Sequence, residues 1–102
     1  MLTRSYILDE HGEPVPCEDL ETLGAWWANN PNRHVARDEL PGDVLVSTVF
    51  LALNYEWREG APPVLWETMV FGGPLDGEQE RYVSRADAVA GHARWLAKVK
   101  AR

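Results

Sequence analysis

Glu67 is the side chain whose setting most strongly suggests a chemical role. It lies within VLWETMVF (residues 64–71), a segment that is otherwise apolar apart from Thr68. In a strand, alternation would place it on one face with three apolar side chains: Leu65, Met69 and Phe71. A carboxylate in that position needs a partner, because an unpaired buried charge is strongly destabilising.

Three kinds of partner could satisfy Glu67. The favoured one is an internal cation, for which the chain offers three candidates: Arg81, Arg37 and His92. The alternative is a ligand, such as a base or a ribose, whose amide or hydroxyl groups donate hydrogen bonds to the carboxylate. Acid–base catalysis is the least favoured, since strand spacing places no second carboxylate beside Glu67.

The loop at residues 54–63 is the second candidate site. Within five residues it carries an amide, two aromatic rings and a guanidinium: Asn54, Tyr55, Trp57 and Arg58. Aromatic faces stack on nucleobases and arginine pairs with phosphate through two hydrogen bonds, so this loop could close over a nucleotide. The alternative is a loop that only covers the edge of its own core. In the ligand-binding interpretation, three strand residues complete the site: Thr48, Glu67 and Arg81.

No catalytic, metal or cofactor motif stands out in the rest of the chain. The three histidines, His11, His34 and His92, are far apart, and no pair has the i, i+4 spacing of a helical zinc site. The GxSxG, P-loop and GxGxxG patterns do not occur. His92 is the most tempting general base, but a core histidine bonded to a neighbour is the favoured interpretation. We therefore expect no catalytic residue, no metal and no cofactor.

A single α+β domain, residues 1–102, would position these side chains. Strands are predicted at residues 2–8, 33–39, 44–53, 64–71 and around 80–83, and helices at about 18–29 and 85–99. Pro14 and Pro16 predict an extended connection after the first strand, and Ser84 resembles the start of a capping box. The order β-α-β-β-β-β-α predicts two layers, an antiparallel sheet of four to five strands with the two helices on one face.

The two central strands, residues 44–53 and 64–71, are mostly apolar on both faces. An antiparallel sheet with one wet face would instead alternate apolar and polar residues. The second face is therefore expected to be covered, either by one of the helices or by a second copy of the chain. We favour a homodimer, because a two-fold interface lets one patch serve both subunits.

Composition and charge restrict the partners and the compartment. The chain is 45% hydrophobic and 25% charged, as in ordinary water-soluble domains, and its net charge of −6 argues against general nucleic-acid binding. It carries no basic-then-apolar N-terminal signal and no apolar stretch of 18 residues, so no membrane association is expected. Cys17 is the single cysteine, which favours a reducing compartment and hence a cytoplasmic protein.

Four segments together resemble a known group of proteins: YILDEHGEPVPC, VSTVFLAL, ETMVFGGPLDGE and ERYVSRADAVAGH. The group is a widespread family of proteins of about this length, encoded in phage and prophage genomes and of unassigned function. The resemblance runs from about Tyr6 to His92 and implies a phage-encoded protein acting inside a bacterium. It supplies no catalytic residues. Where relatives often read LDH after the long strand, this chain reads Leu53-Asn54-Tyr55, which weakens an enzymatic role.

The favoured function is therefore non-enzymatic binding, in which an anti-defence factor sequesters a nucleotide immune signal, such as a cyclic nucleotide, as a sponge does. The alternative is a protein–protein interaction module that inhibits or scaffolds a host or phage protein. Its complementary surface would be the acidic segment at residues 9–21. A small hydrolase that uses Glu67 or His92 is a third hypothesis.

Overall fold

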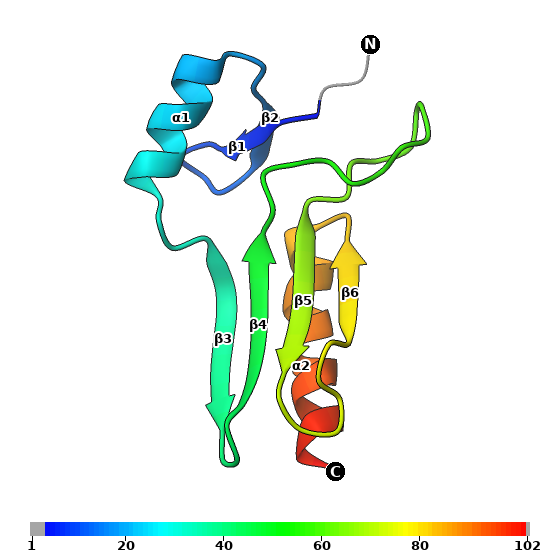
Figure 1. The fold of residues 1–102 in the computed structure, drawn as a ribbon. Coiled ribbons are helices and arrows are strands. Elements are labelled where there is room, and N and C mark those ends of the chain that lie inside the picture. The colour runs from blue at the N-terminus through cyan, green and yellow to red at the C-terminus, as the bar shows by residue number, and fades with distance from the viewer. Residues whose placement is uncertain (1–3, 102) are drawn as a thin grey trace.

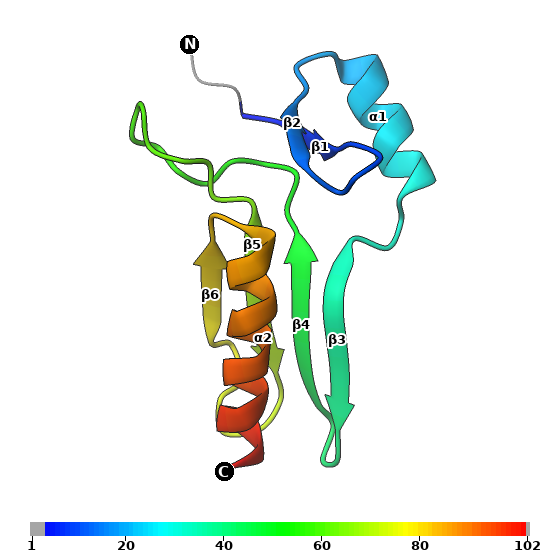
Figure 2. The same ribbon diagram turned by 180° about the vertical axis from the view of Figure 1, so that it is seen from behind.

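Four antiparallel strands form the sheet on which the rest of the molecule is built (Figure 1). They are β3 (His34–Leu40), β4 (Val44–Phe50), β5 (Trp66–Phe71) and β6 (Gln79–Tyr82), hydrogen-bonded in that order. The computed structural model describes residues 4–101. Helix α2 (Arg85–Lys100) lies across one face of the sheet, which gives the two-layer α+β fold expected from the sequence (Figure 2).

The N-terminal segment packs beyond one end of this sheet (Figure 1). There β1 (Tyr6–Leu8) and β2 (Pro14–Pro16) pair as a hairpin, and α1 (Leu20–Asn29) packs against β1. The segment expected to be an extended connection is thus itself a strand, whose central residue Val15 pairs with Ile7. The expectation that both helices cover one sheet face holds for α2 only.

The predicted order of strands and helices is confirmed, while several predicted ends move. β4 ends at Phe50 rather than at residue 53, because Ala52 has a left-handed φ of 64° and turns the chain out of the sheet. The first strand covers only the last part of the predicted range 2–8, of which residues 2 and 3 lie outside the described residues. Ser84 caps α2 as predicted, since its hydroxyl accepts a hydrogen bond from the Asp87 N–H at 3.0 Å.

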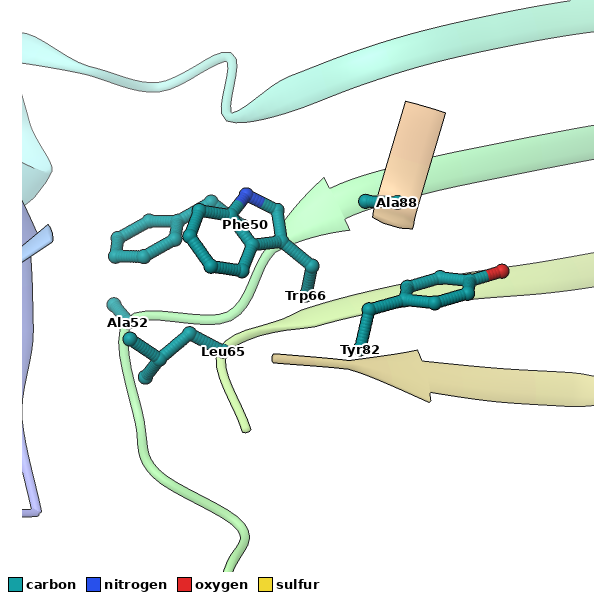
Figure 3. Close-up of a cluster of buried hydrophobic side chains, with 6 residues drawn as sticks. All are labelled: Phe50, Ala52, Leu65, Trp66, Tyr82 and Ala88. Carbon is teal, nitrogen blue, oxygen red and sulfur yellow. The ribbon is translucent and has the colours of Figure 1, made fainter. Parts of the chain in front are cut away.

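The hydrophobic core lies where the N-terminal layer meets the sheet (Figure 3). Six buried residues form it: Phe50, Ala52, Leu65, Trp66, Tyr82 and Ala88. Phe50 connects the N-terminal segment to the sheet. Its ring meets Trp26 of α1 edge-on, with 5.7 Å between centroids, and lies 5.6 Å from the ring of Trp66. Such aromatic contacts add to the stabilisation from burial, so this stack holds α1 to the sheet.

Candidate functional site

The central strands β4 and β5 present two different faces. The face under α2 carries six buried residues: Val46, Thr48, Phe50, Trp66, Thr68 and Val70. The opposite face, called here the open face, is turned toward the viewer in Figure 1, and no helix or further strand of residues 4–101 packs on it. Its central apolar residues are Leu45, Val49, Met69 and Phe71, with Glu67 among them.

Glu67 has an internal cation as its partner, as the sequence favoured. It lies directly opposite Arg81 of β6, whose Nε donates a hydrogen bond of 2.9 Å to the Glu67 carboxylate. The Glu67 side chain is 15% exposed and that of Arg81 is 40% exposed, so water still reaches the pair. The guanidinium of Arg81 also lies over the ring of Tyr55, 4.4 Å from its centroid. Three of the predicted site residues therefore meet at one corner of the open face.

Asn54 is a predicted site residue whose role in the structure is to hold the loop. Its side chain is buried, and its Oδ1 accepts hydrogen bonds from the backbone N–H groups of Glu56 at 2.8 Å and Val64 at 3.0 Å. These bonds connect the beginning of the loop to its end. Both acceptor positions of the amide oxygen are used by these two bonds, which fix the positions of the aromatic residues that follow.

The remaining loop residues are exposed and already have partners within the chain. Arg58 makes a two-pronged ion pair with Glu56, through bonds of 3.0 and 2.9 Å. This contact lowers the pKa of Glu56 to about 2. Trp57 is 75% exposed, and the guanidinium of Arg4 lies 3.9 Å from its ring centroid. We call Tyr55, Trp57, Arg4 and Arg81 the loop corner.

Thr48 does not belong to this corner. The structure places it on the buried face under α2, with no exposed surface, on the side of the sheet opposite Glu67 and Arg81. The prediction that it lines a site with the loop therefore does not hold. Strand alternation separates Thr48 from Val49, and it is Val49 that lies opposite Glu67.

His92 of α2 connects Thr48 to a carboxylate. Its Nδ1 lies 2.7 Å from the Thr48 hydroxyl and its Nε2 lies 2.7 Å from Oδ2 of Asp38 on β3. The histidine side chain is only 7% exposed. The interpretation of His92 as a core histidine bonded to its neighbours agrees with this geometry.

The hydrogen bonds continue from Thr48 across the sheet. Its hydroxyl lies 2.6 Å from that of Thr68, which accepts a bond of 2.8 Å from Tyr82. Tyr82 also lies 3.1 Å from the Glu80 carboxylate, which accepts bonds from Arg94 and Trp95 at 3.0 Å each. We call this series the buried polar chain: it runs from Asp38 through the buried residues His92, Thr48, Thr68 and Tyr82 to Glu80, and the carboxylates at its two ends are 47% and 41% exposed. Sequence reasoning missed all of it except His92 and Thr48, although two threonines within apolar strands were a usable signal.

The buried polar chain contains a carboxylate, an imidazole and a hydroxyl in the order found in hydrolytic triads. Its geometry does not suit that chemistry. Thr48 has no exposed surface and its hydroxyl is shared with Thr68, so a substrate carbonyl could not approach it. The buried polar chain instead supplies hydrogen-bond partners to polar groups beneath α2 that would otherwise be buried unpaired.

Residues 4–101 contain neither a metal-binding cluster nor a membrane-spanning helix. No group of three or more histidine, cysteine, aspartate or glutamate side chains there is arranged to hold a metal ion. Nor does that part of the chain include a helix with the length and apolar character needed to span a bilayer.

Comparison of the chain with known protein families, with curated proteins and with solved structures finds no match. The resemblance to phage-encoded proteins therefore stays a prediction.

Proposed function

We propose that this protein acts by binding rather than by catalysis, and that a second copy of the chain occupies its open face. The observation that supports this proposal is the difference between the two faces of one sheet. The face under α2 is covered by that helix, while the open face leaves apolar side chains at the surface, including Phe71 at 43% exposure. Exposed apolar surface of this kind is typical of interaction sites.

The charges on the open face favour a second copy over an unrelated partner. Arg37 and Glu39 of β3 form one ion pair at 2.9 Å, and Glu67 and Arg81 form another. The face is thus electrically neutral, although the whole chain carries a net charge of −6. Two copies can bring neutral faces together without the repulsion that their other surfaces would generate. A strongly charged partner would find nothing complementary there.

The size of the open face sets the expected strength of the dimer. Four strands whose central members have seven and six residues present a flat area of roughly 400 Å² per subunit, at about 4.8 Å between strands and 3.3 Å per residue. Two subunits would then bury about 800 Å² in total, below the roughly 1,200 Å² at which stable specific interfaces begin and in the range of weak, transient contacts. The proposal therefore predicts a weak dimer that dissociates on dilution.

Sedimentation velocity over a wide concentration range tests this proposal. We expect the wild-type protein to shift from monomer to dimer between about 1 μM and 1 mM, and Met69→Asp to remain monomeric. Val89→Asp is the matched control, because Val89 is 48% exposed on α2, away from the open face. A wild-type protein that stays monomeric throughout, or a Met69→Asp variant that dimerises like the control, would refute the proposal.

A second candidate function is capture of a nucleotide-type ligand at the loop corner, inside a bacterial host cell. One observation favours it. Trp57 is largely exposed beneath the guanidinium of Arg4, which has no carboxylate partner among residues 4–101. The free side of the ring could stack on a base while Arg4 pairs with a phosphate. The phage resemblance would make that ligand an immune signal and the protein an anti-defence sponge.

Calorimetry against cyclic dinucleotides, cyclic trinucleotides and cyclic ADP-ribose isomers tests this second candidate. Binding that is lost in Trp57→Ala and in Arg4→Gln would support it, because each variant removes one half of the stacked pair. Arg58→Gln serves as the control, since Arg58 already has Glu56 as its partner. The absence of any heat change with folded wild-type protein would rule the ligand class out.

A further inference from the structure

The open face carries a basic hollow at the end nearest α1. The hollow has a volume of about 200 Å³, and Val49 of the open face is part of its lining. Arg33 and His34 line it as well, whereas no acidic side chain of the described residues does. Trp27 is 37% exposed and His34 is also exposed, so a partner can reach this hollow. The rest of the lining is apolar: Pro31, Phe50 and Leu51.

The opposite end of the open face is acidic. There the β3–β4 turn, which lies at the far end of these strands from α1 in Figure 1, borders a second hollow of about 340 Å³. Glu39 and Asp43 line this hollow, and no basic side chain of residues 4–101 does. Its remaining lining residues are apolar: Leu40, Val44 and Leu45. The open face is therefore neutral as a whole but polarised along its strands.

Arg33 and Asp43 are the charges at these two ends that have no ion-pair partner in the described chain. The Arg33 guanidinium is oriented by a bond of 2.9 Å from its Nη1 to the Asn30 carbonyl and lies 3.6 Å from the ring centroid of Trp27. Neither contact neutralises its charge, and no carboxylate of residues 4–101 pairs with it. Asp43 is exposed in the turn and likewise has no cationic partner among those residues. Glu39, by contrast, is already part of an ion pair.

A two-fold axis that runs across the strands would bring these unlike ends together. The middle row of the open face contains Ser47 and Met69, which lie side by side on β4 and β5. A half-turn about this row reverses the strand direction of the second copy and places its Leu45 over Val49 of the first. Asp43 comes two residues before Leu45, so the same half-turn carries it about 7 Å beyond Val49, to the basic hollow.

An axis that runs along the strands would instead bring like charges together. It would place the α1 end of one copy against the same end of the other. The loop between β4 and β5 lies at that end too (Figure 1), and the loop corner there includes Arg4, which has no carboxylate partner within residues 4–101. The ends that carry Arg33 and Arg4 would then face each other, which is unfavourable because like charges in contact repel. Charge complementarity thus favours the reversed arrangement.

We propose that the second copy lies on the open face with its strands reversed, and that Asp43 of each subunit pairs with Arg33 of the other. This arrangement rests on the dimer proposed above and adds to it the direction of the subunits and a charged contact. By symmetry the contact is made twice, once at each end of the interface. Each contact also brings the turn of one subunit against the apolar wall at Trp27 of the other, which enlarges the interface beyond the flat sheet.

Exchange of the two charges tests this arrangement by sedimentation velocity at low salt. Arg33→Glu and Asp43→Lys each set like charges against each other at both ends, so each variant should dimerise at least about 10-fold more weakly than wild type. The double variant Arg33→Glu/Asp43→Lys should recover the wild-type affinity to within about 3-fold, because both contacts again join unlike charges. The two residues lie at opposite ends of the same strands, so such a recovery comes from contacts between subunits.

Lys98→Glu/Asp43→Lys is the matched control. It has the same net charge as the wild type, but Lys98 lies on α2, away from the open face, so this variant should dimerise as weakly as Asp43→Lys. Asp43→Asn is a milder change, since asparagine tolerates the left-handed φ of 59° at this position. It removes one charge from each of the two contacts and should weaken the dimer by about 3-fold.

The failure of this arrangement can be told apart from the failure of the dimer itself. If the wild type dimerises and Met69→Asp does not, but Arg33→Glu/Asp43→Lys stays as weak as its control, the strands are not reversed and the proposed dimer still stands. The same conclusion follows if Asp43→Asn dimerises as strongly as the wild type. A wild-type protein that remains monomeric up to about 1 mM would overturn both.

Discussion

Replacing Thr48 by valine should destabilise the protein far more than its small change in shape suggests. A consistent assignment of the protons explains why. The His92 Nε2–H donates to Asp38, so Nδ1 must accept from the Thr48 hydroxyl, which in turn accepts from Thr68. Valine keeps the volume at position 48 but leaves the His92 Nδ1 without a donor and the Thr68 hydroxyl without an acceptor.

The size of the effect follows from these two losses. Each buried polar group left unpaired costs about 1–3 kcal/mol, and the extra methyl group of valine offsets part of that. We therefore expect Thr48→Val to lower the free energy of unfolding by about 2–4 kcal/mol. In a domain of this size that corresponds to a fall in Tm of roughly 10–25 °C. Thr68→Val should cost only about 1 kcal/mol, because the Tyr82 hydroxyl can turn to Glu80 and Thr48 keeps His92.

Urea denaturation followed by circular dichroism measures these differences. The double variant Thr48→Val/Thr68→Val should be more stable than the sum of the single changes predicts, by about 1 kcal/mol or more, because it also removes the hydroxyl that Thr48→Val leaves unpaired. Ser47→Ala is the control, as Ser47 is the neighbouring buried hydroxyl on the other face of β4. If Thr48→Val costs no more than Ser47→Ala, or if the two threonine changes are additive, the buried polar chain does not act as described.

Three other changes should have measurable effects. Gly91→Ala should destabilise the protein by about 1–3 kcal/mol in urea denaturation, because its Cβ would collide with the ring and hydroxyl of Tyr82 and force α2 away from β6. Gly24→Ala should instead stabilise it by about 0.5–1 kcal/mol, since apart from the adjoining backbone of α1 and the two neighbouring residues no atom lies within 4 Å of the new Cβ; a loss of stability there would contradict the packing. Burial alone would raise the pKa of Glu80, but the hydrogen bonds that it accepts, led by that from Trp95, hold it below its ordinary value. Glu80 therefore contributes stability above the unfolded-state pKa of about 4.3 that is lost as the pH falls through the lower folded-state value. Urea midpoints at acid pH should show Glu80→Gln losing less stability on acidification than wild type, and parallel curves would exclude the effect.

Local patterns were sufficient to predict the elements and one part of the candidate site. Glu67 and Arg81 lie on adjacent strands joined by a short connection, so their pairing follows from near neighbours in sequence. The capped start of α2 at Ser84 is likewise a local feature. The end of β4 was not predictable in this way, because the left-handed backbone at Ala52 is held by its burial between layers rather than by its residue type.

The face of the sheet on which a residue lies could not be predicted from local sequence patterns. Alternation shows that Thr48 and Val49 point to opposite faces, but it does not show which face a helix covers. That choice is usually read from the contrast between an apolar and a polar face. In this chain both faces are apolar, so the contrast is weak, and Thr48 was wrongly grouped with the loop. The partnership of Asp38 with His92, 54 residues apart, depends on how α2 lies on the sheet and has no local signal.

The same ambiguity suggests why polar groups are kept within these strands. A slip of β5 by one residue against β4 would exchange its two faces and place Glu67 under α2 and Thr68 on the open face. The apolar residues alone resist such a slip weakly, because either face of β5 would still be largely apolar. The polar residues resist it strongly, since the slip would bury the Glu67 charge away from Arg81 and break the bond between Thr48 and Thr68. We infer that the buried polar chain and the Glu67–Arg81 pair together specify the strand register, and that replacing both threonines with apolar residues would leave a less sharply defined sheet.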